Sequence, residues 1–356
     1  MSVGAERAPA AYRVSHMDRS SRFGLVLLSL LLIVCIATPF WGDRQTMRLL
    51  SELFSYIALA SLWNLLAGYA GLVSVGQQAF VGIGGYTLFL VGLGAGINPL
   101  VGVPVAVLVA VLAAIPIALL LFRLRGPYFT IGSWVVAEIF QQVFLQVDAV
   151  GGGSGISLPA AIVRLIATGR DAREFLVYWI FLAMMVVILG LIVALLRSRW
   201  GLALTAIRDN ELAAVSNGID VKLTRLIVFV VAAGGTAMIG AMIFLQKMTI
   251  TPVSGFSMNN WTVNVIFMTV IGGIGRVEGP ILGAIIFFIL REMLADLGAI
   301  YLIMLGVVAI VVMLWAPKGI WGYLADRYGW QLFPLARHLQ ITRPHVTAAE
   351  PASAER

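Results

Sequence analysis

Long apolar runs recur along almost the whole chain, and they decide what it can fold into. A membrane-spanning helix needs about 20 mostly apolar residues. Seven runs approach that length: 23–40, 49–67, 99–122, 127–147, 175–196, 226–246 and 300–316. The mean hydropathy of +0.98 and the 60% share of hydrophobic residues lie far outside the range of soluble proteins. The sequence therefore predicts an all-α, polytopic integral membrane protein.

Two glycine-rich stretches interrupt this apolar pattern, one in each half of the chain. They cover 66–87 and 271–283. Unwound backbone inside a membrane is tolerated only where protein buries it or water solvates it. Broken segments in both halves are typical of inverted-repeat transporters, so we expect about ten spans with a pathway between the halves. The alternative for any single glycine is close packing of helices through small residues.

These stretches supply most of the candidate residues for a translocation pathway or gate. Polar side chains beside the first stretch could line a cavity, and one carboxylate falls in the middle of the run 127–147. A charge at that depth is costly, so we expect Glu138 either to line the pathway or to be satisfied inside the bundle, protonated or paired with Gln141 or Gln142. The candidates are Asn64, Gly71, Gln77, Gln78, Gly82, Glu138, Gly272, Gly273, Gly275 and Gly279.

Basic residues set the expected orientation. Positive charge favours the cytoplasmic side, and the formal net charge of +7 follows from basic residues at span ends without a nucleic-acid partner. We expect a cytoplasmic tail at 1–22, disordered; a transmembrane domain at 23–317; and a cytoplasmic tail at 318–356, disordered at its end. The loop 197–225 is then cytoplasmic. The loop 148–174 is periplasmic, although it carries Arg164, Arg170 and Arg173.

The loop 197–225 contains a short helix with signals at both ends. Asp209 or Asn210 can cap its start, and Gly218 supplies the left-handed residue that ends it. Two turns of helix are not stable alone in water, so this helix either docks into a groove on a partner or lies on the membrane surface. The candidate coupling residues are Arg208, Asp209, Glu211, Leu212, Ala213, Ala214, Val215 and Gly218.

Several activities are disfavoured by the same residues. The chain has no GxxxxGK[ST] loop for a nucleotide, and no nucleophile, base or ligand set predicts an enzyme, a cofactor or a metal site. The only cysteine, Cys35, excludes disulfides. Val34 precedes it, where a lipoprotein signal needs a small residue, and the run 23–40 ends in an aromatic belt. We therefore expect this run to be a retained span rather than a cleaved signal.

The loop resembles the EAA loop of ABC importer permeases, with Leu212 in place of the first alanine. More specifically, SRWGLALTAIRDNELAAVSNGID is similar to the branched-chain amino acid permease family. The motifs NLLAGYAGLVSVGQQAF, LRGPYFTIGSW, GGGSGI and GGIGRVEGPILGA extend that resemblance over residues 45–320. They are closer to the family's subunit with GPYF and GGIG.VEGP segments than to its partner.

The resemblance implies an inverted-repeat permease subunit in the bacterial inner membrane, with both termini cytoplasmic. Its implied partners are two ATP-binding cassette subunits, a second homologous permease and a periplasmic substrate-binding protein. Branched-chain amino acids, urea, short amides and other amino acids remain open as substrates. The alternative is an ion-coupled secondary transporter, which gives no reason for the 209–218 helix and would need more carboxylates inside the spans.

Overall fold

The computed structural model describes residues 11–15, 19–167, 169–294, 300–328, 332–333 and 338–342. The long helices are α1 (Arg19–Ala37), α2 (Arg44–Asn64), α3 (Gln77–Ala95), α4 (Gly102–Leu121), α5 (Pro127–Gln146), α7 (Arg170–Arg197), α10 (Val221–Lys247), α13 (Glu278–Leu294) and α14 (Ile300–Trp315). Shorter helices are α6 (Ala160–Arg164), α8 (Arg199–Asp209), α9 (Glu211–Ser216), α11 (Pro252–Gly255), α12 (Asn264–Gly272) and α15 (Gly319–Tyr328). The strands are β1 (Ala11–Ser15), β2 (Ile156–Ser157), β3 (Thr249–Ile250) and β4 (His338–Thr342).

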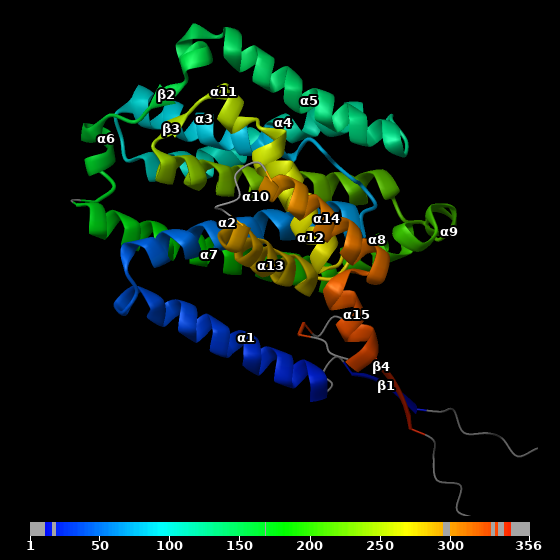
Figure 1. Ribbon diagram of the computed structural model, residues 1–356. Helices are drawn as coiled ribbons and strands as arrows, with labels where there is room; N and C mark the ends of the chain where they lie inside the picture. The colour runs from blue at the N-terminus through cyan, green and yellow to red at the C-terminus, as the bar shows by residue number, and fades with distance from the viewer. Residues whose placement is uncertain are drawn as a thin grey trace, which may run out of the picture.

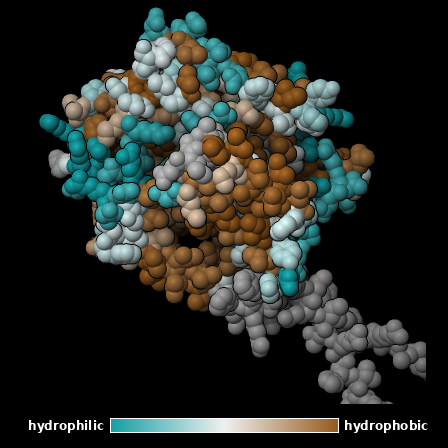
Figure 2. Space-filling view, viewed as in Figure 1, coloured by the Kyte–Doolittle hydropathy of each residue, from teal (hydrophilic) through white to brown (hydrophobic). Residues whose placement is uncertain are grey.

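The molecule is a bundle of roughly aligned helices, which confirms the all-α membrane fold (Figure 1). Among the described residues, five helical segments are long and apolar enough to cross a membrane: Arg44–Tyr69, Pro99–Leu121, Arg170–Arg197, Val221–Lys247 and Ile303–Tyr328. Each of the seven expected spans contains a helix. Figure 2 shows apolar residues over the middle of one face and hydrophilic residues gathered toward its two sides.

The centre of the bundle is the crossing of α3 and α10, where small residues let the two backbones approach. A Cβ on Gly240 would lie 2.5 Å from the carbonyl oxygen of Val81, well inside van der Waals contact. On its other side α10 packs against α4, whose buried stripe is Ala106, Ala110, Ala114 and Ala118. Dispersion contacts at short range replace a solvent-driven hydrophobic effect in such interfaces.

The two glycine-rich stretches contain real breaks, but shorter than the sequence predicts. Regular helix stops after η2 (Leu65–Tyr69), a π-helical turn that continues α2, and resumes at Gln77. It stops again between Gly272 and Glu278. A second π-helical segment, η6 (Met258–Val263), leads into α12. The first break therefore lies between α2 with its π-helical turn and α3, and the second lies between α12 and α13.

The remaining elements close the two ends of the bundle. At one end β2 pairs antiparallel with β3, which ties the loop after α5 to the end of α10. At the other end lie α8, α9 and α15 (Figure 1). There β1 pairs with β4 along five residues, so strands stand at 11–15 and 338–342 where the sequence predicts disordered tails. The predicted tails also include the start of α1 at Arg19 and the helix α15, whereas residues 1–10 and 343–356 lie outside the described residues.

Candidate coupling and transport site

The expected short helix in the 197–225 loop is α9, and its end signals act as the residues suggest. Asn210, rather than Asp209, is the N-cap: its side chain accepts a hydrogen bond from the amide of Ala213 at 3.0 Å. Gly218 has φ +80°, and open space surrounds the position of its missing Cβ. Because only glycine takes this backbone conformation without strain, Gly218 fixes where the chain leaves α9.

One face of α9 is held by the rest of the chain and the opposite face is free. Ala214 is buried against Ile207 and Val221. Glu211 pairs with Arg225 of α10, with Nη2 and Oε2 3.0 Å apart. Leu212 is 81% exposed and Val215 55% exposed. Two large apolar side chains thus stand on a pinned helix with no cover from the described part of the chain. Ala213 is exposed beside them.

The polar residues before α9 point elsewhere. Arg208 and Asp209 are the last two residues of α8, and both side chains are exposed. Nε of Arg208 lies 3.4 Å from Oδ1 of Asp209. A Cβ added at Gly275 would lie 3.6 Å from Nη1 of Arg208, so the guanidinium lies near the second glycine break. No motif spacing predicts that the loop and this break lie close together.

The end of α2, with the π-helical turn η2, meets the second break at a single junction, which we define as Asn64, Gly68, Gly275 and Arg276. Asn64 is buried, donates to the carbonyl oxygen of Arg276 at 2.8 Å and accepts from the amide of Gly275 at 2.8 Å. A Cβ on Gly68 would lie 2.5 Å from that same amide nitrogen. One side chain therefore satisfies backbone groups that the second break leaves unpaired.

The other glycines of the second stretch are packing residues. Added Cβ atoms at Gly272 and Gly279 would collide with backbone across the α12–α13 turn. Gly273, with φ +128°, packs against the start of α15. Glu278 is buried beside this turn and accepts 3.1 Å hydrogen bonds from the amides of Leu332 and Phe333. The C-terminal segment is thereby tied to the second break.

The remaining candidates of the first stretch are divided between packing and hydrogen bonding. Gly82 lies inside α3 against the ring of Phe256, so it serves close packing. Gly71 is exposed in the break with φ +69° and has no neighbour near its missing Cβ. Gln77 and Gln78 are buried at the start of α3, where they accept hydrogen bonds from Thr236 and Thr262. Neither glutamine contacts the junction directly.

Glu138 is separate from these residues, on the outer face of α5. Its carboxylate accepts a 3.0 Å hydrogen bond from the indole of Trp134, so the expected pairing with Gln141 or Gln142 is replaced by a bond one turn earlier. A shallow hollow of about 300 Å³ lies along this face and is lined by Trp134, Val135, Glu138, Ile139, Gln142 and Val143. Most of this lining is apolar, and Glu138 and Gln142 are its two strongly polar residues. A carboxylate facing lipid is costly, so water or another subunit would suit this face better.

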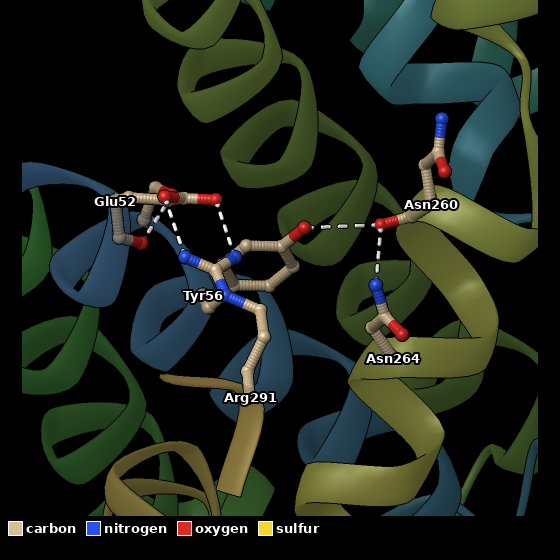
Figure 3. A network of polar contacts seen from close by, with 6 residues as sticks. Glu52, Tyr56, Asn260, Asn264 and Arg291 are labelled. Carbon is tan, nitrogen blue, oxygen red and sulfur yellow. Dashed lines mark hydrogen bonds and ion pairs between the residues drawn. The ribbon is translucent and has the colours of Figure 1, made fainter. Parts of the chain in front are cut away.

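A second polar network was missed from the sequence, at the end of the bundle opposite α9. Glu52 of α2 and Arg291 of α13 form a bidentate ion pair, in which Nη1 and Nη2 of the arginine lie 2.8 and 2.9 Å from Oε1 and Oε2 of the glutamate. The hydroxyl of Tyr56 donates to the carbonyl oxygen of Asn260 in η6, to which Asn264 also donates (Figure 3). The signal was available: Glu52 is a lone carboxylate inside the run 49–67.

A capped helix start marks this same end. Asp43 accepts from the amide of Thr46 at 3.0 Å and from its hydroxyl, so it is the N-cap of α2. These hydrogen bonds favour the ionised form and lower the pKa of the Asp43 carboxyl. Beside it Arg44 pairs with Asp171, which joins the first turns of α2 and α7.

Comparison with known proteins agrees with this architecture. The family described as branched-chain amino acid transport system / permease component matches residues 46–316. The chain is 28% identical to the Escherichia coli (strain K12) high-affinity branched-chain amino acid transport system permease protein LivM, over 85% of this chain and 76% of that protein. It is 27% identical to the LivM protein of Salmonella typhimurium over the same shares. No solved structure matches the chain. The chain belongs to the branched-chain amino acid transport permease family, whose members are membrane transport subunits rather than enzymes.

Proposed function

We propose that this chain is a permease subunit of an ABC importer for branched-chain or similar amino acids, and that separate ATPase subunits dock on α9. The observation that carries the proposal is the exposed pair Leu212 and Val215 on a helix pinned at both ends. Exposed apolar side chains on a short, rigid helix fit a groove on a soluble partner. The names of the relatives support the transport of branched-chain amino acids.

The same geometry supports a route for the signal. Closure of an ATPase pair would move α9, and Arg208 places that loop near Gly275 at the junction. A ligand can drive a conformational change only through contacts that differ between two states. In this proposal the hydrogen bonds of Asn64 to residues 275 and 276 are the contacts that differ.

The pathway in this proposal runs along the face of α5 that carries Glu138, which is half-buried, and Gln142, which is exposed. A second, homologous permease would cover that face, and a periplasmic binding protein would deliver substrate at the end that carries β2 and β3. We place α8, α9 and both termini in the cytoplasm of a cell whose inner membrane holds the complex, because basic residues concentrate in that loop.

The test uses glycines with the same backbone role at opposite ends of the molecule. Gly218→Val forces a β-branched residue into a left-handed position beside α9; Gly96→Val does the same after α3, also in open space with φ +61°. The tagged protein is purified in mild detergent with its partners. We expect Gly218→Val to lose the ATPase subunits and uptake while Gly96→Val retains both. Equal co-purification from the two variants would refute docking at α9.

A direct variant separates docking from strain. Leu212→Asp keeps the backbone of α9 but places a charge in the proposed contact, so it should lower ATPase co-purification without changing membrane insertion. Uptake that persists after ATP depletion in energised vesicles would instead indicate an ion-coupled carrier.

A further inference from the structure

A small cavity lies at the start of α3, between that helix, α10 and η6. It is lined by Leu59, Gln77, Val81, Thr236, Trp261, Thr262 and Val265, all of them buried. The centre of a water-sized sphere can occupy about 10 Å³ inside it. That is room for about one water molecule and far too little for an amino acid.

Polar groups around the cavity have unused hydrogen-bonding capacity. Thr236 donates to Oε1 of Gln77 at 2.9 Å, and within the described part of the chain Nε2 of Gln77 has no hydrogen-bond partner. Thr262 donates to Oε1 of Gln78. Each threonine hydroxyl donates its hydrogen to a glutamine amide oxygen, so the lone pairs of the hydroxyl oxygen can still accept a hydrogen bond. Buried amide donors are rarely left without a partner.

The backbone adds to the same preference for an acceptor. Gln77 is the first residue of α3, and Gly76 before it contributes no side-chain cap. The start of a helix carries unpaired amides and a partial positive charge. A group that directs an oxygen lone pair at the N-terminus of α3 is therefore more stable there than an apolar group.

We propose that this cavity binds one water molecule, which accepts a hydrogen bond from Nε2 of Gln77 and donates to the hydroxyls of Thr236 and Thr262. Three partners are typical of buried water. The site joins two irregular elements, the start of α3 after the first break and the π-helical segment η6. The water would complete hydrogen bonds there that neither element satisfies alone.

Two buried tryptophans provide a matched test. Trp261 lines the cavity and is 3% exposed; Trp63 does not line it and is 2% exposed. Both indoles donate to a backbone carbonyl, to Ser254 and Ser74 respectively. X-ray pulses generate hydroxyl radicals from water, including bound water, and mass spectrometry then measures oxidation of each tryptophan in the purified complex. We expect Trp261 to be oxidised several times faster than Trp63.

Variants connect the labelling to the proposed ligands. Thr236→Val keeps the volume but removes an acceptor for the water together with the hydrogen bond to Oε1 of Gln77, and Gln77→Leu removes the donor to the water; each should lower the oxidation of Trp261 toward that of Trp63. Thr269→Val is the control, because its buried hydroxyl bonds to Val265 and lies outside the cavity lining. Equal oxidation of the two tryptophans in the unaltered protein would overturn the proposal, as would a rate for Trp261 that neither variant changes. If Gln77→Leu does not fold, Thr236→Val alone decides.

Discussion

Gly68→Ala is the sharpest perturbation of the junction between η2 and the second break. The added Cβ would lie 2.5 Å from the amide nitrogen of Gly275 and 2.5 Å from Oδ1 of Asn64, whereas ordinary contact begins near 3.4 Å. Neither atom is at the end of a free, flexible side chain, because Asn64 is buried and bonded at both ends. The junction must therefore open, and both hydrogen bonds of Asn64 are strained or lost.

The magnitude follows from those two bonds. A buried polar group that loses its partner costs about 1–3 kcal/mol, so losing both predicts a destabilisation of about 2–6 kcal/mol. At about 2 °C per kcal/mol for a chain of this size, the apparent melting temperature should fall by about 4–12 °C. The assay is thermal unfolding of the detergent-purified protein, followed by size-exclusion chromatography of what stays folded.

A matched glycine controls for the substitution itself. Gly190 lies inside α7 with open space around its missing Cβ. There alanine replaces glycine in a helix at no steric cost, and it should raise stability slightly, by about 0.5–1 kcal/mol. If Gly68→Ala has the same melting temperature as the unaltered protein, the junction is not packed as described, and its proposed role in switching is refuted.

Further outcomes test other contacts. Glu52→Gln leaves the charge of Arg291 without its carboxylate, so we expect a loss of about 1.5–3 kcal/mol, read as a lower melting temperature; an unchanged one would contradict the ion pair's role. Glu138→Gln keeps an acceptor for Trp134, so uptake should be nearly unchanged at equal expression; a large loss would mean that the charge itself serves transport. Asp43→Ala should be less stable than the unaltered protein, and this difference should have its full size above the ordinary pKa of aspartate. The difference should disappear as the pH falls through the lowered pKa of Asp43 in the folded protein. Thermal unfolding at several pH values measures it.

Local signals in the sequence were enough for the helices and for α9. Apolar runs at 99–122 and 226–246 coincide with α4 and α10, because a span must satisfy its own backbone whatever surrounds it. The end of α9 was likewise predictable from Gly218, since the left-handed residue is a property of one position.

Tertiary relations were not predictable from local pattern. Glycine content cannot distinguish a break at 70–76 from close packing at Gly82, because both use the missing Cβ. Only the neighbour, here the ring of Phe256, separates the two. The Glu52–Arg291 pair joins residues 239 apart, and no spacing rule connects them. For Glu138 the sequence left a pathway-lining role, protonation, and pairing with Gln141 or Gln142 as alternatives, but the indole of Trp134 one turn back was an equal neighbour on the same helix face.

The positions of the polar contacts on α2 suggest why this helix is central to the proposed mechanism. In the middle of α2, Glu52 and Tyr56 bond to α13 and η6; at its C-terminal end Asn64 bonds to the break between α12 and α13. A helix rises 1.5 Å per residue, so about 18 Å separate Glu52 from Asn64. Both sets of contacts join α2 to the second half of the chain, but only the junction lies next to Arg208. In the proposed mechanism a movement of α9 would reach the junction through the loop that carries Arg208, while the distant ion pair would hold the middle of α2 in place as the pivot.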